Sequence, residues 1–201
     1  MTAENSKLEI KAIAPIYGVN YDKGYIGFQG ADDSLICRGI TYVTRWEKMS
    51  DIATQHCFVV ADEDTCVESV MTLNDANGVR RTPMTDYFRP DRSVFFRKPV
   101  GLTATIADLM VKIASDEVGK SYDFGAIIVQ ALSGSLAGRL LSNSQIEVLA
   151  KMLEDPNKWI CSELCAHSLE SAFNRDFFLA SNNSLSPQEL FESNIFQPWK
   201  H

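Results

Sequence analysis

A cysteine at the start of a predicted helix is the feature that most constrains this sequence. Residues 159–165 (WICSELC) begin as an apolar, strand-like approach, and the pattern changes to helical spacing at Cys161. A thiol at a helix N-terminus meets unpaired backbone N–H groups and the positive end of the helix dipole, and both favour the thiolate. An ordinary buried cysteine instead packs as a small hydrophobic side chain. The helix is continued by Leu164, Cys165, Ser168, Leu169, Ala172 and Phe173.

Length and composition narrow the class of protein. The chain has 201 residues, 45% of them hydrophobic, so we expect a single domain over 1–201. The net charge is −7 and no Lys/Arg cluster is interleaved with aromatic residues, which argues against a nucleic-acid partner. Five cysteines without C-x-x-C spacing and only three histidines argue against a disulfide framework or a zinc site. We therefore expect no metal and no cofactor.

The N-terminal residues 1–18 lack a basic start followed by an apolar core, so we expect no conventional secretory signal and a protein made in the cytoplasm. An unconventional export route, for example to the periplasm of a target cell, would leave no such trace. The longest weakly polar stretch, 124–138, is too short and too polar to span a bilayer.

Strand patterns come mostly first and helical patterns mostly later, which predicts an α+β fold with an antiparallel sheet packed on helices. Two β-branched, apolar runs at 55–61 and 66–72 flank an acidic turn and predict a hairpin. Ser186 before Pro187 predicts a short capped helix. The other predicted strands are at about 8–13, 78–83 and 93–96, and residues 25–41 are predicted to form a strand, a turn at 30–33 and a short further element. The other predicted helices are at 103–118, 124–141, 144–154 and from 162 to about 173.

A cysteine nucleophile needs a base, and the base needs a group that orients it. His56 is the best candidate base because it stands at the start of a strand. Glu68 lies in the next strand of the predicted hairpin, and an isolated acid in an apolar run costs folding energy unless it is paired. His167 is rejected, because six residues along the same helix place it about 240° around the axis from Cys161. The alternatives are a structural histidine at 56 and a solvent-facing acid at 68.

Several segments, in this order, resemble the permuted, YiiX-like branch of the NlpC-type cysteine peptidases. The resemblance covers roughly residues 25–191, and each motif is weak alone. It is carried by the order and spacing of Gly39-Ile40-Thr41 with His56-Cys57-Phe58-Val59-Val60, Cys66-Val67-Glu68-Ser69 with Gly78-Val79, Val118-Gly119-Lys120-Ser121-Tyr122-Asp123-Phe124, Ile160-Cys161-Ser162-Glu163-Leu164, and Leu185-Ser186-Pro187-Gln188-Glu189-Leu190.

The resemblance implies a circularly permuted papain-like fold with a helical insertion at about 133–154 before the catalytic helix. It implies that Cys161 is the nucleophile, that His56 is the general base and then acid, and that Glu68 orients His56. Tyr122 matches a family tyrosine that binds substrate or the oxyanion; a core tyrosine is the alternative. This chain departs from the family where Gln55 replaces the usual serine before the histidine.

Three functions are compatible with these residues. The first is a cysteine amidase or peptidase that forms an acyl-enzyme, which the resemblance directs to peptidoglycan stem peptides. Such an enzyme could recycle cell-wall fragments or act as a secreted antibacterial effector, whose partners would include a secretion machine or an immunity protein. The second is lipid acyl hydrolysis or transfer, as in the similar lecithin–retinol acyltransferase group. The third is a catalytically inactive binding module on the same scaffold.

Overall fold

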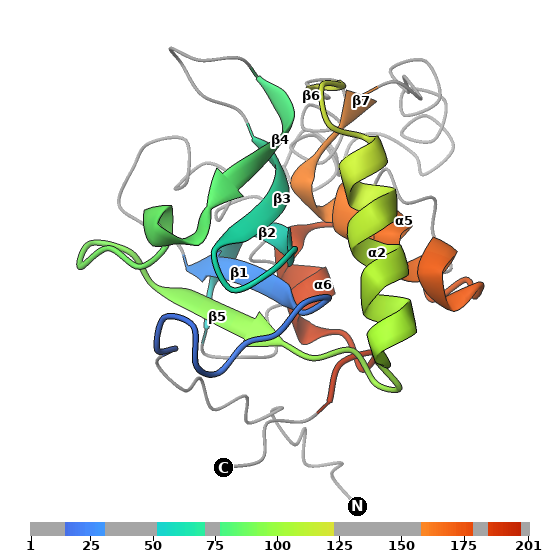
Figure 1. The fold of residues 1–201 in the computed structure, drawn as a ribbon, viewed down its shortest axis with the longest axis horizontal. Coiled ribbons are helices and arrows are strands. Elements are labelled where there is room, and N and C mark those ends of the chain that lie inside the picture. Colours follow the sequence, from blue (N-terminus) through green and yellow to red (C-terminus); the bar gives the residue numbers. More distant parts are fainter. Residues whose placement is uncertain (1–14, 31–51, 71–76, 123–157, 179–184, 198–201) are drawn as a thin grey trace, which may run out of the picture.

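A five-stranded antiparallel sheet forms the centre of the molecule, in the order β4-β3-β2-β1-β5 (Figure 1). The computed structural model describes residues 15–30, 52–70, 77–122, 158–178 and 185–197. The strands are β1 (Ile26–Gly30), β2 (Thr54–Val60), β3 (Thr65–Val70), β4 (Gly78–Pro83) and β5 (Val94–Arg97). A separate parallel pair is formed by β6 (Ser121–Tyr122) and β7 (Lys158–Trp159).

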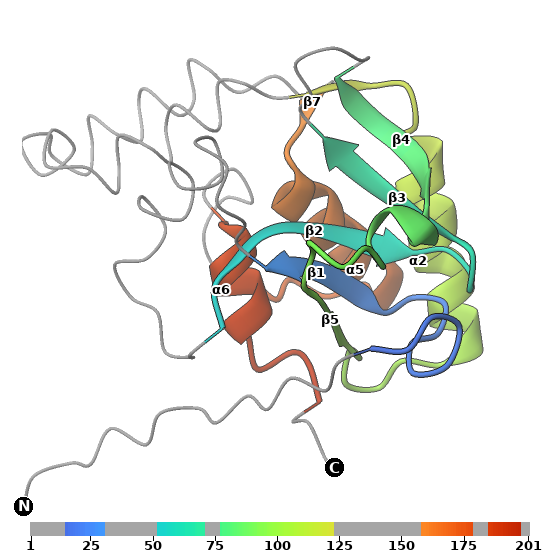
Figure 2. The same cartoon turned by 90° about the vertical axis from the view of Figure 1, so that its left-hand side faces the viewer.

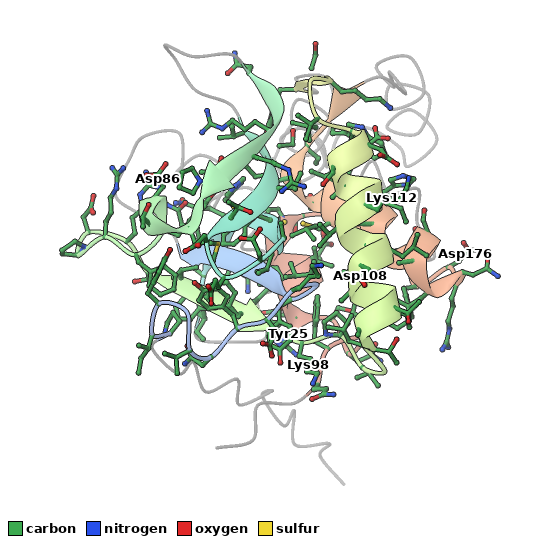
Figure 3. All side chains as sticks on the ribbon, viewed as in Figure 1. Tyr25, Asp86, Lys98, Asp108, Lys112 and Asp176 are labelled. Carbon is green, nitrogen blue, oxygen red and sulfur yellow. The ribbon has the colours of Figure 1, made fainter. Side chains whose placement is uncertain are left out.

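Three helices cover one face of the sheet (Figure 2). They are α2 (Ala104–Asp116), α5 (Cys161–Phe173) and α6 (Pro187–Glu192). In α2, the Thr103 hydroxyl accepts the Ile106 N–H at the helix start, and the buried residues Ala107, Met110 and Ala114 recur at helical spacing. The opposite side of α2 carries Asp108 and Lys112, which point away from the sheet (Figure 3).

Alternation along β2 divides the interior into two clusters. Cys57 and Val59 face the helices and join the larger core, whereas Phe58 and Val60 face the other side. Phe58 lies directly over Gly27 of β1, where an added Cβ would come within 2.1 Å of the ring. A side chain at position 27 would therefore displace Phe58. The second cluster is completed by Tyr21, Cys66, Met84, Tyr87, Val94 and Phe96.

The predicted α+β fold is confirmed, and so is the hairpin, which the structure places at β2 and β3. The expected helices at 103–118 and from 162 appear as α2 and α5, and Ser186 caps α6 with its hydroxyl on the Glu189 N–H. The sequence patterns missed the short 3₁₀ helix η2 (Met84–Asp86) and the pairing of β6 with β7. The predicted strand at 8–13, helices at 124–141 and 144–154, and insertion at 133–154 lie outside the described residues.

None of the helices in the described ranges is both long enough and apolar enough to cross a membrane.

Candidate active site

Cys161 is the first residue of α5, directly after the β7 strand and the N-cap residue Ile160. Local hydrogen bonds hold this helix start in place. The Glu163 carboxylate accepts the Ile160 N–H at 3.1 Å, and the Ser162 hydroxyl donates to the Leu185 carbonyl at 2.5 Å. Cys161 is only 6% exposed. The helix N-terminus therefore presents a positioned and largely buried thiol.

His56 and Glu68 meet across the β2–β3 hairpin. The register pairs Val59 with Val67, so Glu68 lies diagonally across from His56 rather than opposite it. The His56 Nε2 atom lies 2.7 Å from Glu68 Oε2, with the two side chains 15% and 2% exposed. Because Nε2 binds the carboxylate, Nδ1 is the ring nitrogen left to exchange a proton with another group.

Glu68 is the centre of a larger hydrogen-bonded cluster. On one carboxylate oxygen it accepts the Thr82 hydroxyl at 2.5 Å and the Arg80 Nε at 3.2 Å, both from β4. Its other oxygen accepts the Tyr87 hydroxyl as well as His56. Burial opposes ionisation, but the hydrogen bond and charge of His56, and then Thr82 and Tyr87, lower the pKa of Glu68 from 4.5 to about 2. The carboxylate is therefore ionised throughout the physiological range.

The charge on His56 is set by Cys161. Burial disfavours an imidazolium, but the negative charge of Cys161 and a hydrogen bond to it, with a smaller effect of Glu68, raise the pKa of His56 from 6.5 to about 10. A hydrogen bond from the Cys57 side chain, opposed by burial and assisted by His56, lowers the pKa of Cys161 well below its usual value of 9.0. The two pKa shifts therefore both favour a thiolate beside an imidazolium over a neutral thiol–imidazole pair.

The neighbouring thiols behave differently. Burial, followed by contact with Cys161 and Cys165, raises the pKa of Cys57 well above 9.0, and burial does the same for Cys66. These two side chains remain protonated near neutral pH. Cys57 can therefore donate a hydrogen bond to the Cys161 sulfur, which distinguishes Cys161 from its neighbours.

Tyr122 lies on β6, and its register partner on β7 is Trp159, two residues before Cys161. The structure thus places it beside the strand that leads into α5, largely buried. His167, which the helical spacing excluded, packs against the Trp159 ring with centroids 4.9 Å apart.

The residues around Glu68 were missed by sequence reasoning. Arg80 lies opposite Glu68 in the register of β3 and β4, and its place in the predicted strand at 78–83 was a usable signal. Thr82, two residues later, shares its strand face. Tyr87 follows η2 in an irregular segment, where no periodicity indicates its direction.

A β-bulge lies next to His56. The register pairs Gln29 with His56 and Gly30 with Thr54, so Gln55 has no partner on β1. Gln55 is only 5% exposed, and in the part of the chain that the structure describes no group donates a hydrogen bond to its buried Oε1 atom.

Comparison with known proteins supports the fold. No family model matches the chain, and a search of curated proteins finds no relative. Among solved structures, it is similar to metalloprotein YiiX from Escherichia coli O157:H7, DUF1105, with a TM-score of 0.54 and 16% sequence identity over 88% of this chain and 94% of that one. The chain has a YiiX-like fold. This confirms the YiiX part of the resemblance at the level of architecture.

YiiX is described as a metalloprotein. Within the described ranges, no three His, Cys, Asp or Glu side chains are grouped as metal ligands.

Proposed function

We propose that the protein is a cysteine hydrolase of the amidase or peptidase type, on a permuted papain-like scaffold, with a Cys161–His56–Glu68 triad. The observation that carries the proposal is that His56 interacts with both the Cys161 sulfur and the Glu68 carboxylate. A base held between a nucleophile and an orienting acid is the arrangement that covalent acyl transfer requires. An inactive binding module has no need for a thiolate and an imidazolium in contact.

The proposed reaction has two halves. The Cys161 thiolate attacks the carbonyl carbon of an amide, a C–S bond forms, and His56 gives its proton to the leaving nitrogen as the C–N bond breaks. Water then attacks the thioester with His56 as base, which releases the acid and restores the thiolate. Glu68 keeps Nε2 of the ring occupied throughout. The Cys161 backbone N–H and the Tyr122 hydroxyl are the proposed donors to the developing oxyanion.

The proposed substrate is a small peptide of the cell-wall type, a proposal that rests on the resemblance to NlpC-type peptidases. Peptidoglycan stem peptides would be met in the cytoplasm during recycling or in another cell after export as an effector. For the lipid alternative, the apolar stretch 124–141 is the segment that would suit an acyl chain, and it lies outside the described residues.

The first test is the rate of iodoacetamide alkylation across pH 4–9, measured for each cysteine by mass spectrometry. We expect Cys161 to react fast at a pH well below that of an ordinary thiol and to slow in His56→Ala. Cys66, whose thiol is buried and protonated, is the internal control and should react slowly. Cys161→Ala should abolish turnover without unfolding the protein, because a small residue at a helix start costs little stability.

Equal reactivity of Cys161 and the other cysteines would contradict the proposed nucleophile. Full turnover in Cys161→Ala would overturn the mechanism itself.

A further inference from the structure

Gln55 combines three properties that set it apart from the other residues of β2 in the structure. It is the extra residue of a bulge, it immediately precedes His56, and its Oε1 atom is buried without a hydrogen-bond donor in the described part of the chain. Bulges beside active sites re-aim a side chain out of the regular alternation. An unsatisfied buried acceptor also destabilises the folded state. A residue with no role beyond the fold would be expected to avoid both costs.

The surroundings of Gln55 place it at the proposed site. On one side, the Thr54 N–H donates to Gln188 of α6 at 2.8 Å. On the other side, His56 interacts with Cys161 through a side-chain hydrogen bond. The start of α5 is itself tied to the segment before α6 by the hydrogen bond between Ser162 and Leu185. Gln55 therefore lies on β2 between two residues that contact helices: Thr54, which binds α6, and His56, which interacts with the first residue of α5.

Gln55 and Cys161, the proposed nucleophile, are buried to a similar degree, with exposed fractions of 5% and 6%. What Gln55 lacks is a donor, and the donor that a peptide brings beside an attacked carbonyl is its N–H group.

We propose that Oε1 of Gln55 accepts the N–H of a peptide group next to the bond that Cys161 attacks, so that the site selects peptides over fatty acyl esters. The inference rests on the proposed cysteine hydrolase function and names its substrate class. A site with a buried acceptor discriminates against a ligand that leaves this acceptor unpaired. An acyl chain has no N–H and leaves Gln55 unsatisfied.

Three p-nitrophenyl esters test this directly: those of N-acetylglycine, N-acetylsarcosine and pentanoic acid. In each, the Cys161 thiolate attacks the ester carbonyl, a C–S bond forms, the C–O bond breaks, and p-nitrophenolate leaves with the electron pair. The sarcosine ester differs from the glycine ester only in replacing the N–H by N–CH₃. The pentanoate has an acyl chain of the same length without a peptide group. Rates are divided by those with free N-acetylcysteine to remove intrinsic reactivity.

We expect the wild-type protein to be acylated by the glycine ester roughly 5- to 150-fold faster than by the sarcosine ester, the range that an unpaired buried acceptor corresponds to. Gln55→Leu and Gln55→Met, which remove the acceptor, should bring this ratio close to one. Their acylation by the pentanoate and their alkylation by iodoacetamide should stay within a few-fold of wild type. Gln29→Leu, which removes the buried glutamine opposite His56 on β1, should keep the wild-type ratio.

Two outcomes overturn this inference while the proposed function stands: a wild-type ratio near one, or a ratio that persists in both Gln55 variants. A pentanoate rate above the glycine rate overturns it in favour of a lipid substrate. If Cys161 is neither alkylated nor acylated rapidly in the wild-type protein, the proposed function fails as well.

Discussion

Glu68 and Gln55 are both buried polar residues beside His56, yet their environments are opposite. Glu68 accepts hydrogen bonds from Thr82, Arg80, Tyr87 and His56, and its charge is compensated. Gln55 has a buried oxygen to which no described group donates. The Glu68 side of the candidate site is thus saturated with internal hydrogen bonds, whereas the Gln55 oxygen is not.

The difference separates two tasks within one site. Saturated groups hold the histidine in one orientation and tautomer, and this contributes to stability. An unsatisfied group lowers stability but is available to a ligand. Substitutions on the Glu68 side should therefore cost stability and rate together, whereas substitutions at Gln55 should change recognition without a loss of stability.

The largest effect on this contrast is expected from Glu68→Gln. It removes the charge that orients His56 and leaves donors without an ionised acceptor, so turnover should fall by about 10²-fold, less than in Cys161→Ala. The pKa of Glu68 falls from 4.5 to about 2 on folding, which corresponds to about 3 kcal/mol of stability at neutral pH. Urea unfolding of both proteins at pH 7 and at pH 2–3 measures this difference.

The direction in which stability changes with pH tests whether the ionised Glu68 carboxylate is the source of this stabilisation. A lowered carboxyl pKa stabilises the fold above its unfolded value of 4.5, and this stability is lost as the pH falls through about 2. The stability gap between wild type and Glu68→Gln should therefore be full at pH 7 and narrow below pH 4.5. A gap that is constant with pH would mean that the loss comes from packing.

A second prediction concerns the alkaline limit of activity. The pKa of His56 is raised from 6.5 to about 10, so the imidazolium that protonates the leaving group persists until that pH. The stability that the charged His56 contributes is fully present below pH 6.5 and is lost as the pH rises through about 10. Turnover should fall near pH 10 in the wild-type protein and at lower pH in Glu68→Gln. A pH–rate profile with a basic limb near 6.5 would contradict the thiolate–imidazolium pair.

A smaller effect is expected from Tyr87→Phe, which removes one of the partners of Glu68 and keeps the ring in its cluster. The loss should be about 1.5–3 kcal/mol of unfolding free energy, typical of one hydrogen bond to a charged group. Thermal or urea unfolding measures it. Thr82→Val is the matched comparison, since it removes a hydroxyl that binds the other carboxylate oxygen. No loss in either variant would show that the Glu68 cluster is not saturated as described.

The smallest effect on stability is expected from Gln55→Leu. Because the variant replaces an unpaired buried acceptor by an apolar group of similar size, its free energy of unfolding should equal or exceed that of the wild type. The same urea titration measures it, with Gln29→Leu as control. A loss of more than about 1 kcal/mol would place Gln55 among the structural residues, like Glu68.

Local patterns were enough to predict the hairpin and the helix starts, because strand alternation and capping act over a few residues. They brought His56 and Glu68 onto neighbouring strands, but the diagonal contact depends on a register that the short turn alone does not determine. Pairing of β1 with β5, which aligns Ile26 with Arg97, depends on long-range contacts that no local pattern indicates. The contact of Tyr87 with Glu68 and the bulge at Gln55 depend on the same long-range packing.

The distance along the chain between the proposed catalytic groups has a kinetic consequence. His56 and Cys161 are 105 positions apart (161 − 56), and Cys57 joins Cys161 in one core cluster. Closing such a long loop costs chain entropy before any contact compensates for it, so α5 is expected to dock on β2 late in folding. Because the thiolate depends on partners from β2, a refolding chain should regain its backbone hydrogen bonds before Cys161 becomes reactive. The reactivity of Cys161 therefore reports when α5 docks on β2 during refolding.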